Sequence, residues 1–118
     1  MQKSILVVDD SMVSRLMVKS IIGTEFPDAN IFEAASGDDA LDKIKSVEHI
    51  DIALVDFNMP GFDGLELFSR LADAVNIEKK ALLTANIQEN IKQRTESAGI
   101  TFINKPINED AIRAFISG

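Results

Sequence analysis

Residues 52–61 read Ile-Ala-Leu-Val-Asp-Phe-Asn-Met-Pro-Gly, and this stretch sets the pattern for the whole chain. Its first four residues form an apolar run of the length expected for a buried strand. Asp56 follows at once, and the chain then turns at Pro60 and Gly61. A carboxylate at the margin of a hydrophobic core is unfavourable unless another group pairs with it. The stretch therefore predicts a buried strand that ends at an acid in need of partners.

Apolar runs and helical periodicities alternate along the rest of the chain. The predicted strands are residues 5–8, 30–34, 51–55, 81–83 and 100–103. The predicted helices lie within residues 11–23, 36–47, 65–71, 87–98 and 107–116. Because the connections are short and the strand runs are apolar, the pattern is typical of a doubly wound α/β fold. In such a fold, helices cover both faces of a parallel sheet, here of five strands.

Several residues mark where the helices begin and end and which face packs on the sheet. Ser36 is the predicted N-cap of the second helix. Gly23 and Gly99 are the predicted ends of the first and fourth helices. In the first helix, the predicted buried stripe consists of residues at helical spacing, namely Val13, Leu16, Met17, Ser20 and Ile21.

Length and composition indicate a single domain over residues 1–118, of which 46% are hydrophobic and 26% charged. The net charge of −7 argues against non-specific binding to nucleic acid or to an anionic membrane. The chain contains no cysteine, so disulfides and thiolate chemistry are excluded. The apolar run 5–8 is too short for a signal peptide, and no run approaches the length of a membrane span. We therefore expect a soluble cytoplasmic domain.

Polar side chains stand at the carboxyl ends of four predicted strands. Asp9 and Asp10 follow the first strand, Asp56 the third, Thr84 the fourth and Lys105 the fifth. Ligands of open parallel α/β sheets bind at this edge, and neighbouring strands lie only about 5 Å apart. These five side chains are therefore expected to share one pocket.

The three acids of this pocket repel one another, and a cation among them would offset the repulsion. Two unit charges about 5 Å apart repel by roughly 3 kcal/mol at an effective dielectric constant of about 20. Either one acid stays protonated or a cation lies between them, and an all-oxygen set favours Mg²⁺. Lys105 can pair with a phosphoryl oxygen, and Thr84 can donate its hydroxyl to another. The set predicts a site for phosphoryl transfer with Asp56 as the nucleophile.

Four motifs follow one another along the chain: Val-Val-Asp-Asp-Ser at 7–11, Val-Asp-Phe-Asn-Met-Pro-Gly-Phe-Asp-Gly at 55–64, Leu-Thr-Ala at 83–85 and Asn-Lys-Pro at 104–106. With these motifs the chain resembles the response-regulator receiver family of two-component signalling, in particular its chemotaxis-type (CheY-like) members. The motifs cover essentially the whole chain in order and spacing. The resemblance implies a flavodoxin-like (βα)5 fold with strand order 2-1-3-4-5.

The resemblance also implies a role for each of the three acids. Asp56 would accept phosphate from the phosphohistidine of a sensor kinase or phosphotransfer protein. Asp10 and Asp56 would bind Mg²⁺ directly, together with the backbone carbonyl of Asn58. Asp9 would act on the metal mainly through water. Beyond its own phosphorylation and dephosphorylation, the domain would be no enzyme.

The same resemblance implies a switch. Thr84 would move its hydroxyl toward the phosphoryl group, and Lys105 would pair with the phosphate and precede a cis bond to Pro106. Phe102 matches the family's switch aromatic, although an ordinary core position explains it equally well. The signalling face, which an unknown output partner would read, would lie within residues 87–116.

Three further positions carry weaker predictions. Asn58 and Asn86 occupy the two places that tune rates in this family, and neither can act as a general base. We therefore expect no unusually fast loss of the phosphoryl group. Asn86 does not indicate how long that group persists. His49, the only histidine, follows Glu48 in a predicted loop. It is expected to be a surface residue rather than a ligand, because nothing beside it in the sequence forms a site.

Two other functions compete with the receiver hypothesis. A small Mg²⁺-dependent phosphohydrolase working through an aspartyl-phosphate would need an acid two residues after the nucleophile, where this chain has Asn58. A flavodoxin-like nucleotide or flavin binder would need a glycine-rich loop after the first strand, where Asp9 and Asp10 stand instead. The sequence leaves open the cognate kinase, the output target, the oligomeric state, and whether the chain is a complete regulator or part of a longer protein.

Overall fold

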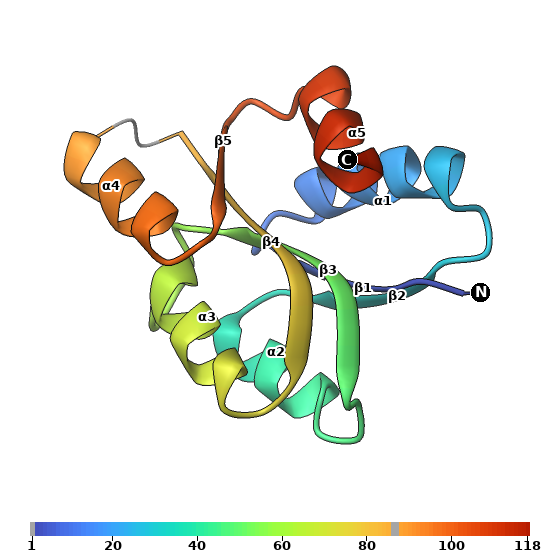
Figure 1. Ribbon diagram of the computed structural model, residues 1–118, viewed down its shortest axis with the longest axis horizontal. Helices are drawn as coiled ribbons and strands as arrows, with labels where there is room; N and C mark the ends of the chain where they lie inside the picture. The colour runs from blue at the N-terminus through green and yellow to red at the C-terminus, as the bar shows by residue number, and fades with distance from the viewer. Residues whose placement is uncertain (1, 86–87) are drawn as a thin grey trace.

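A computed structural model of the protein describes residues 2–85 and 88–118. A five-stranded parallel sheet forms its centre, in the order β2-β1-β3-β4-β5 (Figure 1). The strands are β1 (Ser4–Val8), β2 (Asn30–Ala34), β3 (His49–Asp56), β4 (Asn76–Thr84) and β5 (Thr101–Asn104). The helices are α1 (Met12–Glu25), α2 (Gly37–Lys43), α3 (Gly64–Ala72), α4 (Glu89–Ser97) and α5 (Glu109–Ser117). The predicted fold class and strand order are confirmed.

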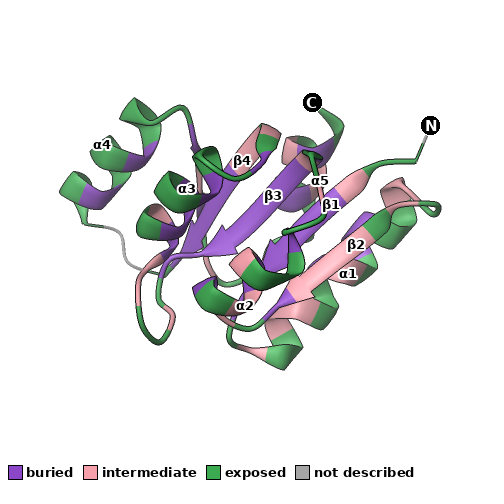
Figure 2. Cartoon of the chain, turned by 90° about the horizontal axis from the view of Figure 1, so that it is seen from below, coloured by how far each residue is buried: buried purple, intermediate pink, exposed green. Residues whose placement is uncertain are grey.

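The helices divide between the two faces of the sheet and bury a hydrophobic layer on each. One layer joins the sheet to α1 and α5 and includes Ile22, Ile112 and Ile116. The other lies under α2, α3 and α4 and includes Leu67 and Leu71. β3 is central, and each of its residues from 52 to 56 is buried (Figure 2). Burial on both faces explains why this strand reads as a continuous apolar run.

The strands extend further than the sequence predicts at their amino ends. β3 begins at His49 rather than at residue 51, and β4 begins at Asn76 rather than at residue 81. The added part of β4 contains polar residues at exposed or half-buried positions, so it lacks the apolar signal of a buried strand. Pairing with β3, in which Asn76 faces His49, holds this part of β4 in the sheet.

Helix α1 departs most from the prediction. Gly23 lies inside α1, which continues to Glu25, so the predicted helix end is wrong. The predicted buried stripe is also wrong in large part, because Val13, Leu16 and Met17 are exposed. The buried residues of α1 are instead Val18, Ile21 and Ile22. Both sets have the i, i+3, i+4 spacing of one helical face, and packing against the sheet selects the second set.

Other helix signals are confirmed. The Ser36 side chain accepts a hydrogen bond from the Asp39 backbone N–H at 3.1 Å and caps α2. Gly99 follows α4 with a φ of +76°, a conformation that favours glycine. Asn86 and Ile87, which carry a rate-tuning prediction and the start of the fourth predicted helix, lie outside the described residues. Among the described helices, none is long and apolar enough to cross a membrane.

We expect two glycines to respond to alanine in opposite ways. A Cβ at Gly64 would lie 2.5 Å from the Asp56 carbonyl oxygen and 2.7 Å from Leu82 Cδ1, whereas one at Gly23 meets nothing within 4 Å. Gly64→Ala should lower the free energy of unfolding by about 1–3 kcal/mol through overpacking. Gly23→Ala should raise it by about 0.5–1 kcal/mol, because alanine favours the helix. Urea unfolding measures both changes, and equal midpoints for the two variants would contradict this packing.

Candidate functional site

The carboxyl edge of the sheet brings the predicted acids together. Asp9 follows β1, Asp56 ends β3, and both side chains are buried, with 4% and 5% of their surface exposed. Asp10, beside them, is exposed. One oxygen from each of the three carboxylates can be chosen so that all three lie within 4.8 Å of one another. The acids are therefore close enough to share a single cation.

Lys105 is the basic partner of these acids. Its Nζ lies 2.9 Å from Asp9 Oδ2 and 3.2 Å from Asp56 Oδ1, and its side chain is only 19% exposed. The Lys105 backbone is held in place, because its N–H donates to the Thr84 carbonyl oxygen at 2.9 Å and extends the pairing of β5 with β4. The bond from Lys105 to Pro106 is cis, as predicted.

The charges of the cluster do not balance without a further cation. Burial raises the pKa of Asp56 to about 6, and the neighbouring charges of Asp9 and Asp10 act in the same direction against the opposing effect of Lys105. Burial acts to lower the pKa of Lys105, but its hydrogen bond to Asp9 and the charge of Asp56 raise the pKa above its usual value. One ammonium thus faces three carboxyl groups, which leaves an excess of negative charge.

The turn between β1 and α1 is held by a network that the sequence prediction missed. Arg15 Nη1 donates to the backbone carbonyl of Asp9 at 2.6 Å, and its Nε pairs with Glu33 Oε1 at 3.0 Å. Lys19 pairs with the other oxygen of Glu33 at 2.9 Å. Hydrogen bonds from Lys19 and Arg15 hold the pKa of Glu33 below its usual value. The Arg15 side chain is 14% exposed and lies about one helical turn past Asp9 and Asp10. Its contacts with Glu33 and with the Asp9 carbonyl form only when the chain is folded.

The turn after Asp56 is anchored to both sides of the site. The Phe57 N–H donates to the Leu83 carbonyl, and its carbonyl accepts from the Gly64 N–H, each at 2.9 Å. Asn58 then lies exposed beside Asp10 and lines a hollow of about 510 Å³. Its position next to the acids agrees with the predicted use of its carbonyl, which stays a prediction.

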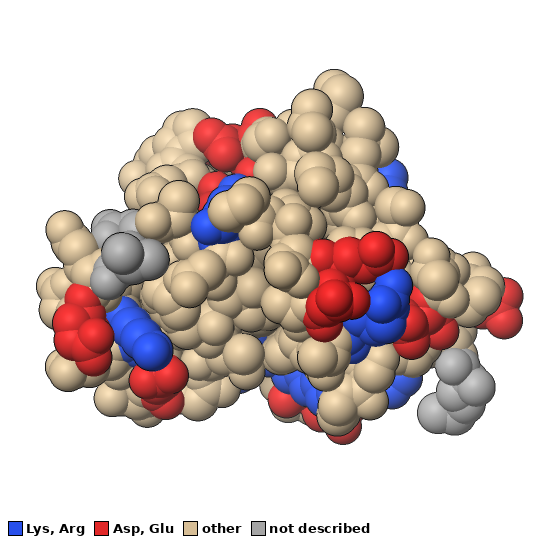
Figure 3. Space-filling view, turned by 90° about the horizontal axis from the view of Figure 1, so that it is seen from above, with Lys and Arg blue, Asp and Glu red and all other residues tan. Residues whose placement is uncertain are grey.

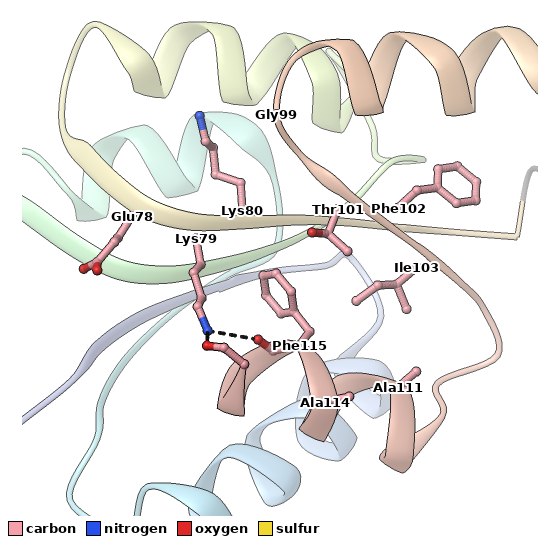
Figure 4. Close-up of a pocket in the computed structure, with 11 residues that line it drawn as sticks. Glu78, Lys79, Lys80, Gly99, Thr101, Phe102, Ile103, Ala111, Ala114 and Phe115 are labelled. Atoms are coloured by element: carbon pink, nitrogen blue, oxygen red, sulfur yellow. Dashed lines mark hydrogen bonds between the residues drawn. The ribbon is translucent and has the colours of Figure 1, made fainter.

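The two predicted switch residues lie on neighbouring strands. Thr84 is buried, with 1% of its surface exposed, and ends β4 next to Asn104 of β5. Phe102 is half-buried and packs against the hydrophobic layer under α2, α3 and α4. In Figure 4, Phe102 and Ile103 project from opposite sides of β5, with Ile103 toward α5. The switching roles of both residues stay predictions.

A separate pocket lies away from the acids. It measures about 620 Å³ and lies between the β4–β5 edge and α5, with Phe102 and Phe115 in its lining (Figure 4). Lys79 crosses its floor and donates to the carbonyl oxygens of Phe115, at 3.3 Å, and of Gly118. Most of its lining lies within residues 87–116, the predicted signalling face, and none of it belongs to the acid cluster.

Charged side chains on the face shown in Figure 3 gather in clusters of mixed sign. Arg113 of α5 pairs with Glu25 at 2.9 Å, with Glu109 at 2.6 Å and with Asp110 at 3.4 Å. Pairing of this kind offsets the positive charge that a nucleic-acid backbone would need.

Comparisons with known proteins agree with this geometry. The pattern of the response regulator receiver domain matches residues 5–117. Sporulation initiation phosphotransferase F of Bacillus subtilis is 32% identical over 114 residues, which cover 96% of this chain and 90% of that protein. Sensor protein EvgS of Escherichia coli K12 is 34% identical over 115 residues, which cover 97% of this chain but only 9% of EvgS. The chain thus corresponds to a small part of that sensor.

A solved structure shares the fold over nearly the whole chain. A chain of the CheX-CheY-BeF3-Mg+2 complex from Borrelia burgdorferi aligns with a TM-score of 0.78 and 26% identity, covering 97% of this chain and 86% of that one. The family pattern, these relatives and the shared fold lead to one conclusion. The chain belongs to the response regulator receiver domain family of two-component signalling systems.

Proposed function

We propose that Asp56 is the phosphoacceptor of this receiver domain and that it takes its phosphoryl group from a phosphohistidine in a Mg²⁺-dependent reaction. The observation that carries the proposal is the pairing of Lys105 with both Asp9 and Asp56 at the ends of adjacent strands. An acid nucleophile, acids for a metal and a cation for the transferred group are thereby held in one place.

The side chains fit Mg²⁺. The set is all oxygen, it is partly exposed through Asp10, and it carries more negative charge than Lys105 neutralises. Asp10 and Asp56 would bind the ion directly, with the carbonyl of Asn58, while Asp9 would act through water. The ion, when bound, supplies positive charge for the carboxylates and the phosphoryl oxygens. The related CheX-CheY-BeF3-Mg+2 complex of Borrelia burgdorferi contains this metal, which supports the choice of Mg²⁺.

The residues of the chain then have distinct tasks in the transfer. An oxygen of Asp56 forms a bond to phosphorus as the bond from phosphorus to the donor's imidazole nitrogen breaks, and the nitrogen keeps the electron pair. Lys105 donates to a phosphoryl oxygen, and the Thr84 hydroxyl donates to another. Asn58 has no carboxyl to activate water, so the product is an aspartyl-phosphate signal rather than a turnover intermediate of a phosphohydrolase.

The protein that delivers phosphate is expected to contact α1. Met12, Val13, Leu16 and Met17 are large apolar residues that are 45–66% exposed, and α1 begins two residues after Asp10. Exposed apolar residues that adjoin a reactive site mark a protein contact. We propose that a phosphohistidine-bearing kinase or phosphotransfer protein covers them while its imidazole reaches Asp56, and that an output partner reads the face of α4, β5 and α5.

Replacing the nucleophile tests the central claim. Acetyl phosphate with Mg²⁺ should add one base-labile phosphoryl group, about 80 Da by intact mass, to the wild type and none to Asp56→Asn. Asp28→Asn, a change at an exposed acid remote from the site, serves as the matched control and should be phosphorylated like the wild type. Equal labelling of Asp56→Asn would show that another residue accepts the phosphate.

The raised pKa of Asp56 gives the metal-free protein a pH-dependent stability. Its native pKa of about 6 exceeds the ordinary value of 3.8. The native state therefore binds more protons between these values, and its stability falls as the pH rises through them. Asp56→Asn cannot ionise and should lack this fall, so that in EDTA at pH 7 it is the more stable protein. Urea unfolding monitored by circular dichroism at several pH values measures the difference.

Millimolar Mg²⁺ should reverse that order. The ion binds the folded site and not the unfolded chain, so it stabilises the wild type more than Asp56→Asn. Thermal melts that coincide with and without Mg²⁺ would contradict a metal site at these acids, whatever the outcome of the labelling experiment.

Arg15 should act as a positioning residue for the metal-binding turn. Arg15→Met removes the hydrogen bond to the Asp9 carbonyl, and we expect roughly tenfold weaker Mg²⁺ binding, as for other groups that orient metal ligands. Lys19→Met is the control, because Lys19 shares the Glu33 partner without reaching Asp9. Titration calorimetry gives both affinities, and unfolding experiments separate them from lost stability. Equal Mg²⁺ affinities for the two variants would contradict the role.

A further inference from the structure

A second group of potential metal ligands lies at the other end of the sheet. His49 Nε2 is 3.3 Å from Asp51 Oδ1 and 3.6 Å from Glu78 Oε2. Ligand atoms of the three residues lie within 4.8 Å of one another. His49 starts β3 and Asp56 ends it, so the two groups are roughly 23 Å apart at the usual rise per residue.

This arrangement corrects the expectation for His49. The residue is exposed, as predicted, but it belongs to β3 rather than to a loop. The sequence did not reveal its neighbours in space, because pairing of β3 with β4 sets His49 opposite Asn76 and brings Glu78 within reach. The start of β4 is polar, so the sequence does not indicate a strand there. For the same reason it does not indicate that Glu78 lies near His49.

The Asn76 side chain orients the imidazole. Its amide nitrogen, Nδ2, lies 3.0 Å from His49 Nδ1 and donates to it in this placement. A 180° rotation of the amide exchanges its oxygen and nitrogen, and Asn76 Oδ1 then accepts the Nδ1 proton. The lone pair of Nε2 then points at the two carboxylates. Histidines that bind metals commonly donate their other ring N–H to an oxygen in this way.

Asp51 is oriented and ionised by its surroundings. The backbone N–H of Ser4 donates to Asp51 Oδ2 at 2.8 Å, which leaves Oδ1 directed toward His49. This hydrogen bond lowers the pKa of Asp51 against the opposing effect of burial, with smaller contributions from His49 and the nearby charge of Lys3. Glu78 completes the set from an exposed position.

The distances suit a small tetrahedral ion. Zinc binds nitrogen and oxygen at about 2.0–2.2 Å, so two ligand atoms of a tetrahedral site lie about 3.3–3.6 Å apart. The separations of Nε2 from the two carboxylate oxygens match this range. Two carboxylates, a neutral imidazole and a divalent ion also sum to zero charge. A nitrogen ligand favours transition metals over Mg²⁺, which separates this cluster from the all-oxygen site at Asp56.

We propose that His49, Asp51 and Glu78 form a binding site for a divalent transition metal of the Zn²⁺ class, with water in the fourth position. Such an ion ties the starts of β3 and β4 together at the end of the sheet remote from the phosphoacceptor. The competing state of the same cluster is a protonated His49 paired with both carboxylates, which needs no metal.

Calorimetric titration of the whole chain with Zn²⁺, in excess Mg²⁺ to occupy the acids at Asp56, tests the proposal. We expect one site per chain. Glu78→Gln and His49→Asn should each weaken it at least tenfold, while Glu48→Gln, which changes an exposed acid next to His49 outside the cluster, should leave the affinity unchanged. Equal losses of Zn²⁺ affinity in Glu48→Gln and Glu78→Gln would show non-specific attraction to acidic residues and would overturn the proposal.

The single histidine makes a second readout unambiguous. On Zn²⁺ addition at neutral pH, the imidazole Nε2 resonance should shift while Nδ1 keeps its proton, and Glu78→Gln should suppress the shift. An imidazole that titrates with pH but ignores saturating Zn²⁺ would establish the protonated pair instead. Zn²⁺ uptake abolished by Asp10→Asn and unaffected by His49→Asn would place the metal at the phosphoacceptor site. Glu78→Gln should be phosphorylated normally, so this proposal can fail without the proposed function failing.

Discussion

One half-buried ammonium facing two buried carboxylates is the interaction on which the site depends. Lys105 reaches Asp9 from β1 and Asp56 from β3 although it starts beyond β5, and it can do so only because the sheet has the order β2-β1-β3-β4-β5. Acids at the edge of a core would otherwise oppose folding. The lysine offsets part of the repulsion between the acids, and the remaining negative charge favours a further cation.

The sequence was sufficient for the part of the fold that follows from strong, local signals. Central strands are buried on both faces, so β1 and β3 appear as apolar runs, and the polar residues that end them stand out. Since parallel strands finish at one edge, their order in the sequence is enough to group Asp9, Asp56, Thr84 and Lys105. The family resemblance then supplied the roles of the individual residues and the cis bond, which spacing alone does not.

The sequence failed where two patterns fit equally well or where a partner comes from elsewhere in the chain. Helix α1 carries two apolar stripes of the same period, and only docking on the sheet decides that Val18 and Ile22 are buried while Leu16 is not. The start of β4 is polar, and its strand conformation follows from pairing with β3. Arg15 donates to Glu33 and to the Asp9 carbonyl. The residues next to Arg15 in the sequence indicate neither contact.

The strands that carry the site differ in how firmly they are held. Asp56 ends the eight-residue β3, which has a neighbour on each side, and α3 abuts its carbonyl at Gly64. Lys105 follows β5, an edge strand of four residues with one neighbour. Displacing β5 therefore disturbs fewer contacts than displacing β3. A group that pulls on Lys105 is therefore expected to displace the edge strand β5 before it displaces Asp56 at the end of β3.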